Sequence, residues 1–207
     1  MLFLVNTSSA VQNTTSTTIT VNVPSSTANN DLMILVVVSA TAANTWTTPS
    51  GWTVWRASGN GRAIYYRTAS SEPASYTVTQ SGSSTASAYI LSYRNASIDV
   101  MGTLGSPADP SVAPSITTTA DDAYVFYFVA NPGQSSNTYS TPTGFTPLVS
   151  DTDGTAPSSA IFYKVQATAG ATGTASSDIG SGLPLSLQFS IIPTTIINGN
   201  FFFMMGA

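Results

Sequence analysis

The feature of this sequence that most constrains its fold is a pattern that occurs twice. The stretch "TPSGWTVW" at residues 48–55 returns as "TPTGFTPL" at residues 141–148, so that Pro49 and Pro142 lie 93 residues apart. In each copy, a Gly between the Pro and an aromatic residue supplies the permissive backbone of a tight turn, and the aromatic can anchor the next strand in a core. We therefore interpret the motif as a repeated building block and not as a binding site.

The segments around this motif also correspond in pairs. "NNDLMILVVVSA" answers to "ADDAYVFYFVA", "RAIYYRTAS" to "SAIFYKVQA", and "SAYILSYRN" to "PLSLQFSII". The separation grows from 91 residues between Asp31 and Asp122 to 97 between Ile64 and Ile161, as expected when strands are kept and loops change length. This alignment predicts that Asp31 and Asp122 are equivalent carboxylates, each accepting backbone N–H bonds before a buried strand.

The distribution of apolar residues predicts an all-β fold. Short runs rich in Val, Ile, Tyr and Thr alternate with Pro, Gly, Asn and Ser clusters, and no stretch keeps a helical period. Ser and Thr make up roughly three residues in ten, whereas charged residues make up only 7%. The predicted strands are 15–23, 32–40, 52–57, 63–68, 75–80, 87–94, 115–119, 123–130, 145–150, 160–166, 171–177 and 185–192.

These strands predict a single β-sandwich, jelly-roll-like, built from two sequence repeats. Six short strands with little charge would form a weak sandwich alone, so we expect both repeats to supply strands to two facing sheets. The expected organisation is an N-terminal arm (1–14), a sandwich domain (15–193) and an apolar C-terminal tail for assembly (194–207). Within the sandwich, we expect repeat 1 at about 15–96, a Pro-rich connector at 97–114 and repeat 2 at about 115–193.

Composition argues against several classes of function. The chain has no His and no Cys, which removes the usual general base, metal ligand and reactive thiol, so we predict no catalytic residues, no metal and no cofactor. A net charge of −4 with five cations leaves no basic surface for nucleic acid. The longest apolar run, "LMILVVV", is too short to span a bilayer, and "MLFLVNTSS" lacks the basic start of a secretory signal. We expect neither nucleic acid nor a membrane as a partner.

Two sets of carboxylates are weaker candidates for a site. Asp151 and Asp153 in "SDTDGTAP" resemble the start of a calcium loop, but the later acidic ligands are missing, and a turn between strands explains them more simply. Asp99, Asp109 and Glu72 could meet in space as a glycosidase pair, which is the lowest-ranked hypothesis.

The Trp residues are candidates for contact with a glycan. Trp46 and Trp55, together with Trp52, Tyr65 and Tyr66, could form a platform on which sugar rings stack. Alternation in "WTVW" and "AIYYR" places some of these rings on opposite faces of a strand, so core packing is the favoured interpretation for at least part of the set.

The C-terminal segment is a candidate partner interface. Its uncharged apolar block would be an aggregation hazard in water, and it is too short to be a transmembrane anchor. We expect a neighbouring subunit to bury it, with folding back onto the sandwich as the alternative. The block consists of Phe201, Phe202, Phe203, Met204 and Met205.

The order of motifs resembles a loosely defined group of small β-sandwich proteins from tailed bacteriophages and bacterial genomes. The resemblance rests on "DLMILVVV", "PSGW", "IYYR", "SEPASYTVT" and "YILSYRN", and it covers about residues 15–193. Members of this group are often duplicated in the same way and are described as virion structural proteins. The resemblance thus implies a setting and no particular site.

Two functions fit this setting. The first is a capsid decoration (cement) protein that binds the major capsid protein or another virion protein, self-associates as a trimer, and is made in the host cytoplasm before joining the outer surface of the capsid or tail. The alternative is a tail-fibre or receptor-binding module that recognises a host-surface glycan. Low charge and an apolar terminus suit permanent assembly, in which interfaces bury apolar surface.

Overall fold

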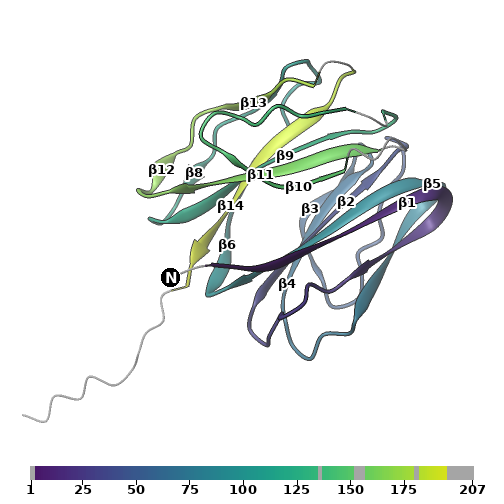
Figure 1. Ribbon diagram of the computed structural model, residues 1–207, viewed down its shortest axis with the longest axis horizontal. Helices are drawn as coiled ribbons and strands as arrows, with labels where there is room; N and C mark the ends of the chain where they lie inside the picture. The colour runs from purple at the N-terminus through teal and green to yellow at the C-terminus, as the bar shows by residue number, and fades with distance from the viewer. Residues whose placement is uncertain (1–2, 135–136, 152–156, 180–181, 195–207) are drawn as a thin grey trace, which may run out of the picture.

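The computed structural model describes residues 3–134, 137–151, 157–179 and 182–194 (Figure 1). Every regular element in these residues is a β-strand, and every strand pairing is antiparallel. The strands are β1 (Phe3–Asn22), β2 (Leu32–Ser39), β3 (Thr53–Gly59), β4 (Arg62–Thr68), β5 (Ser75–Arg94), β6 (Ala96–Met101), β7 (Ser111–Ala113), β8 (Thr117–Thr118), β9 (Ala123–Asn131), β10 (Thr146–Asp151), β11 (Ser158–Gln166), β12 (Gly170–Ala171), β13 (Ala175–Ser177) and β14 (Leu185–Pro193).

Two five-stranded sheets form the body of the protein, and each draws its strands from one half of the chain. Sheet 1 has the order β1-β5-β2-β4-β3, and sheet 2 has the order β10-β11-β9-β14-β6. The two sheets pack face to face (Figure 1), which gives the predicted all-β sandwich. A single residue, Asn95, connects β5 to β6 and therefore joins the two sheets; its φ of 56° lies in the left-handed region.

The main core lies between the two sheets. Alternate residues of β2 such as Ile34 and Val36 face alternate residues of β9 such as Phe126 and Phe128. Aromatic contacts cross or line this interface: Phe189 stacks on Phe126 with ring centroids 4.7 Å apart, and Trp55 meets the edge of Phe189 at 5.3 Å. Each sheet therefore buries its inner face against the other.

The outer face of each sheet is covered as well. On sheet 1, the later part of β1 and the early part of β5 fold over residues such as Met33 and Leu35 and form a second core. On sheet 2, the short pair β7–β13 and the adjoining Ile116 cover residues such as Val125 and Tyr127. Because both faces are covered, all residues of β2 are buried, which explains the continuous apolar run "LMILVVV".

Most of the predicted strands are confirmed, and four stretches of strand were not predicted. Residues 81–86, expected between two strands, belong to β5, which continues without a break from 75 to 94. Residues 3–14, expected as an arm, are the first part of β1 and pair along β5. Within the expected connector 97–114, the structure places most of β6, which pairs with β14, and β7, which pairs with β13. Residues 3–14 and 81–86 are rich in polar residues, above all Ser and Thr, which gives little apolar signal for a strand. The strand β6 lies at a sheet edge, and β7 lies in a two-stranded pair.

The two sheets share details of register. Ile34 pairs with Tyr66 and Leu91, and Phe126 pairs with Tyr163 and Phe189, in each case on the two flanking strands. The edge strands β3 and β10 both carry an irregularity at the same place, after Val54 in β3 and after Pro147 in β10.

The repeated Pro-x-Gly motifs form turns of the same geometry. Trp52 donates its backbone N–H to the carbonyl O of Pro49 at 3.1 Å, and Phe145 donates to Pro142 at 3.0 Å. The intervening glycines have φ values of 77° (Gly51) and 80° (Gly144), which a residue with a side chain adopts only with strain. Both aromatics that follow are buried, as the building-block interpretation predicts.

One detail of the predicted alignment is corrected by this register. The pairings make Asn30 the counterpart of Asp122, since both precede the central strand and both have positive φ, of 72° and 57°. The residues before them also match. The side-chain oxygen of Asn29 accepts the backbone N–H of Ser71, which follows β4, and that of Asp121 accepts the backbone N–H of Ala169, which follows β11. Asp31 therefore lies one residue after the position that corresponds to Asp122, and of these two carboxylates only Asp31 is buried.

Candidate functional site

Both described ends of the chain lie at one corner of the molecule. Phe3 at the start of β1 pairs with Arg94, and Thr194 after β14 donates its backbone N–H to the carbonyl O of Asn95 at 2.8 Å. Figure 1 shows the start of β1 beside the end of β14. A hollow of about 400 Å³ opens at this corner; it is lined by Asn29, Asn30, Asp31, Arg94, Asn95, Ala96 and Thr194.

An ion pair fixes this corner. Asp31, which is 1% exposed, accepts hydrogen bonds from the Arg94 guanidinium at 2.8 and 2.9 Å and from the backbone N–H of Ala28 at 2.8 Å. Burial alone would raise the pKa of the Asp31 carboxyl, but the hydrogen bonds and the charge of Arg94 outweigh it and lower that pKa. The pair ties the start of β2 to the end of β5, so it holds the point from which the chain ends depart.

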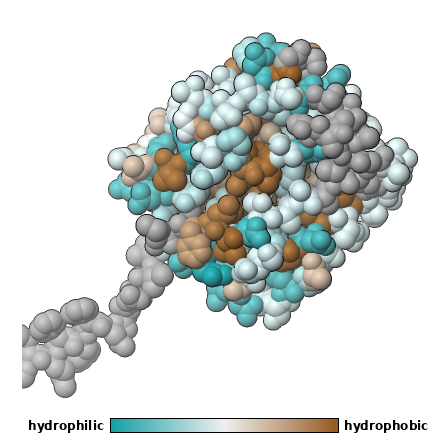
Figure 2. Space-filling model, viewed as in Figure 1, coloured by the Kyte–Doolittle hydropathy of each residue, from teal (hydrophilic) through white to brown (hydrophobic). Residues whose placement is uncertain are grey.

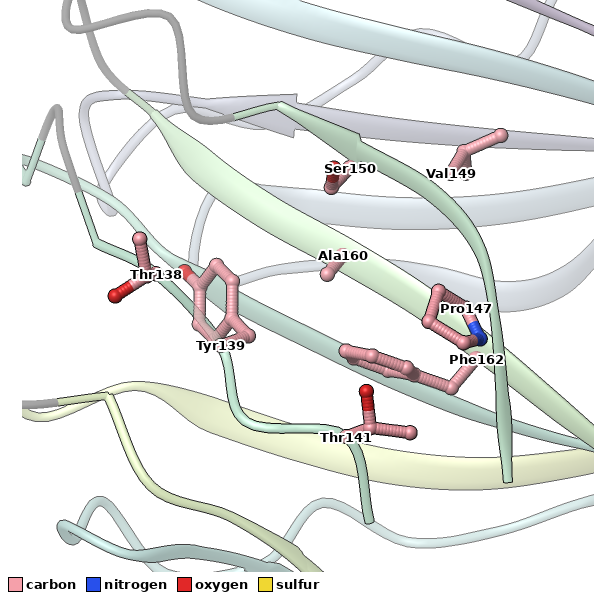
Figure 3. Close-up of a pocket in the computed structure, with 8 residues that line it drawn as sticks. All are labelled: Thr138, Tyr139, Thr141, Pro147, Val149, Ser150, Ala160 and Phe162. Atoms are coloured by element: carbon pink, nitrogen blue, oxygen red, sulfur yellow. The ribbon is translucent and has the colours of Figure 1, made fainter.

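A second hollow lies on the outer face of sheet 2, beside the loop that precedes the repeated turn. Figure 3 shows Tyr139 on one side and Pro147 on the other, with Ala160 and Phe162 between them on β11. The pocket measures about 230 Å³, and its other lining residues are Thr138, Thr141, Val149 and Ser150. A shallower hollow of about 380 Å³ adjoins it and shares Thr138 and Tyr139.

Tyr139 is held rigidly in this pocket. Its hydroxyl donates to the carbonyl O of Ser158 at 2.9 Å, and burial raises the pKa of its phenol to about 12. Phe162 is only 4% exposed, so it forms a fixed floor. None of the described residues that line the 230 Å³ pocket is charged, so this part of the lining is suited to holding a small neutral group.

The predicted glycan contacts Trp46 and Trp55 do not form an exposed platform. Trp46 is 5% exposed, and its indole Nε1 donates to the carbonyl O of Gly61 at 2.9 Å. Trp55 is half-buried and packs on Tyr66 and Phe189 in the main core. Both side chains take part in core packing, which was the favoured interpretation from strand alternation.

Two of the described cations, Arg67 and Lys164, pack on aromatic rings. Arg67 lies over the ring of Trp52 at 5.9 Å and pairs with Glu72 at 3.0 Å. Lys164 lies over the ring of Phe145 at 5.0 Å. Each cation therefore covers the aromatic that follows a Pro-x-Gly turn, in both halves of the chain.

Arg62 is a buried cation that joins the two halves of the chain. It is 1% exposed and donates to the carbonyl O of Ala130 in β9 at 2.5 Å and to that of Asn60 at 2.7 Å. Burial lowers the pKa of its guanidinium to about 10.

The candidate carboxylates have separate structural partners. Glu72 binds Arg67, Asp99 accepts from the hydroxyls of Thr119 and Ser190, and Asp109 accepts from a backbone N–H. Asp151 is 4% exposed at the end of β10, and Asp153 lies outside the described residues. Within the described ranges, no three His, Cys, Asp or Glu side chains are grouped so as to hold a metal ion.

The predicted partner interface, Phe201 to Met205, lies outside the described residues. In the described part of the chain, no helix has the length and apolar character needed to cross a bilayer. Searches against protein-family models, curated proteins and solved structures find no match to this chain. The protein is therefore assigned to a class by its own structure: an all-β chain of antiparallel sheets packed as a sandwich.

Proposed function

We propose that this chain is a virion structural protein of a tailed bacteriophage, and specifically a capsid decoration (cement) protein. It would bind the major capsid protein or another virion protein on the outer surface of the particle and self-associate as a trimer. The observation that carries the proposal is the shared corner: residues 3 and 194 are both fixed next to the β5–β6 connection. An element that clamps neighbouring subunits needs such a fixed point of departure, and the apolar block at 201–205 follows it by only a few residues.

The surface supports a role in lasting assembly. In the face drawn in Figure 2, most of the surface is pale, of intermediate hydropathy, and apolar residues gather in a band across the middle. With five cations and nine anions in the whole chain, ion pairs at the surface add little to the free energy of binding, since exposed pairs contribute about 1 kcal/mol or less each. Apolar burial would therefore dominate attachment.

We also propose that the sandwich is a duplication of one unit, jelly-roll-like in having two packed antiparallel sheets. The two sheets have the same strand order: β1-β5-β2-β4-β3 in sheet 1 corresponds, strand by strand, to β6-β14-β9-β11-β10 in sheet 2. The matching turns, the positive φ values and the irregularities in β3 and β10 support the same correspondence. Repeats 1 and 2 would then be two halves of one folding unit that share the central core.

The decoration role is tested by locating the chain in intact particles and then removing its attachment. Antibody-gold labelling of purified phage particles should mark the head, and deletion of residues 195–207 should release the chain while the sandwich still unfolds cooperatively. Replacing Phe202 and Phe203 together with Asp should also abolish co-sedimentation with particles, because a buried unpaired carboxylate costs several kcal/mol. The matched control is Val165→Asp on β11, a position that is already 50% exposed.

Salt separates apolar attachment from attachment through charges. Wild-type protein should remain bound to particles in about 1 M NaCl, where exposed charge pairs are screened within about 3 Å. Release by moderate salt, normal binding of the double Asp variant, or absence of the chain from purified particles would each refute the proposed role.

The alternative is a tail-fibre or receptor-binding module that recognises a host-surface glycan. Since Trp46 and Trp55 are used in packing, this alternative depends on another surface. Gold label on the tail in place of the head would favour it.

A further inference from the structure

The 230 Å³ pocket lies at a place where the two halves of the chain differ. Trp46 in the first half and Tyr139 in the second half each stand three residues before the Pro of the repeated turn. The indole Nε1 of Trp46 donates to the carbonyl O of Gly61, and the hydroxyl of Tyr139 donates to that of Ser158, both at 2.9 Å. Gly61 and Ser158 in turn lie three residues before Ile64 and Ile161 of the equivalent strands, so the two aromatic side chains are counterparts.

In the first half, the chain itself fills this space. The larger indole of Trp46 is almost fully buried. The hydroxyl of Tyr65 on β4 donates to the carbonyl O of Trp46 at 3.3 Å and lies near the side chain of Thr48. A ring and a hydroxyl group thus occupy the outer face of sheet 1 at this point.

In the second half, the side chains at both of these positions are smaller. Tyr139 has one ring where Trp46 has two, and Phe162 stands at the position of Tyr65 without its hydroxyl. Thr141, the counterpart of Thr48, lines the pocket that remains. The missing contacts define what an occupant would replace: part of a flat ring, and a hydroxyl that meets Thr141.

We propose that this pocket binds one neutral pyranose ring of a glycan. Tyr139 and Pro147 offer apolar surface to the C–H face of the sugar above the buried Ala160 and Phe162, while the hydroxyl-bearing Thr141 and Ser150 lie at the two ends of the pocket (Figure 3). An apolar lining with a few placed polar groups is typical of small-molecule sites, and a volume below the usual range of about 300–1,000 Å³ fits a single ring. The described residues of the lining carry no charge, which favours a neutral sugar over a charged one.

This inference does not rest on the decoration role, since a sugar could be bound by a head protein or by a tail module. It identifies a surface that could serve glycan recognition in place of Trp46 and Trp55. A failure of the sugar test would leave the attachment test through residues 195–207 unaffected.

The test is a ¹H–¹⁵N NMR titration of the full-length protein with methyl glycosides of glucose, galactose, mannose and N-acetylglucosamine. At least one should give saturable shifts centred on the amides of Ser150 and Ala160, with a Kd on the order of millimolar. Thr141→Val should weaken that binding about fivefold through loss of one hydrogen bond. Tyr139→Trp, which installs the residue of the first half, should weaken it at least tenfold by filling the pocket.

The matched control is Thr48→Val, the same change at the counterpart position, which should leave the affinity unchanged. Because Thr141 is exposed, its variant remains informative even if Tyr139→Trp fails to fold. The proposal is overturned if no glycoside shifts these amides up to about 50 mM, a concentration that detects even very weak binding. It is equally overturned if p-cresol shifts them and no glycoside does, or if Thr141→Val binds as tightly as the wild type.

Discussion

Phe189→Ala should destabilise the whole protein and not only sheet 2. The Phe189 side chain is fully buried between the sheets, where it stacks on Phe126 and meets Trp55 from β3. Removing a buried Phe side chain costs about 3–5 kcal/mol, a range that already includes its ring contacts. For a domain of this size, each kcal/mol lowers the melting temperature by about 2–4 °C, so we expect a fall of roughly 8–16 °C for a loss of about 4 kcal/mol.

Urea denaturation followed by both circular dichroism and Trp fluorescence checks this prediction. All three Trp residues belong to the first half of the chain, whereas Phe189 belongs to the second. With an m-value near 3 kcal/mol/M, the midpoint should fall by about 1.3 M for both signals and m should stay constant. The control Val165→Ala, at a half-exposed position, should change stability by less than about 0.5 kcal/mol. A Trp signal that keeps its wild-type midpoint in Phe189→Ala would show that the halves unfold separately and would refute the shared core.

Two further changes test the corner and the turn. The pKa of the Asp31 carboxyl is lowered in the folded protein, so its ionised form stabilises the fold at pH values above the ordinary Asp pKa near 4. This stabilisation is lost as the pH falls through the lower folded pKa. Asp31→Asn should therefore be less stable than wild type at pH 7, and thermal melts should show the difference narrowing towards pH 3. Gly144→Ala should lower the free energy of unfolding by about 1–2 kcal/mol, because Gly144 has a φ of 80°. The control Gly59→Ala should be near neutral, because the space around Gly59 is also open but its φ does not lie in the left-handed region. Equal melting temperatures of the two variants would contradict this reasoning.

Much of this fold could be predicted from the sequence because its central strands are buried on both faces. Runs such as "LMILVVV" and "AYVFYFV" have few alternatives to a covered strand, and the repeated Pro-x-Gly turn set the boundaries between strands. The first part of β1 was missed because an edge strand needs few apolar residues. The one-residue error at Asp31 arose because the residue before the central strand, not the carboxylate itself, has the left-handed backbone that the turn requires.

The candidate site could not be predicted in the same way. The pocket depends on two differences between the halves: Tyr139 stands in place of Trp46, and Phe162 stands in place of Tyr65. The first correspondence is recognised only when the hydrogen bond of Tyr139 to Ser158 is compared with that of Trp46 to Gly61. The sequence directed attention to the three Trp residues as large candidate contact rings. In the structure, the two selected as glycan contacts are used for packing, and the hollow lies in the half of the chain that has no Trp.

The single-residue connection at Asn95 has a consequence for how the chain is synthesised. Every strand of sheet 1 precedes it and every strand of sheet 2 follows it, so a ribosome completes one sheet before the other exists. At about 5–20 residues per second, residues 96–193 take roughly 5–20 s to emerge. During that interval Ile34, Val36 and Leu91, which lie in the central core of the finished protein, have no opposite sheet to cover them. We therefore expect the nascent first half to expose this apolar face until sheet 2 is complete, so slower translation of the second half should increase aggregation.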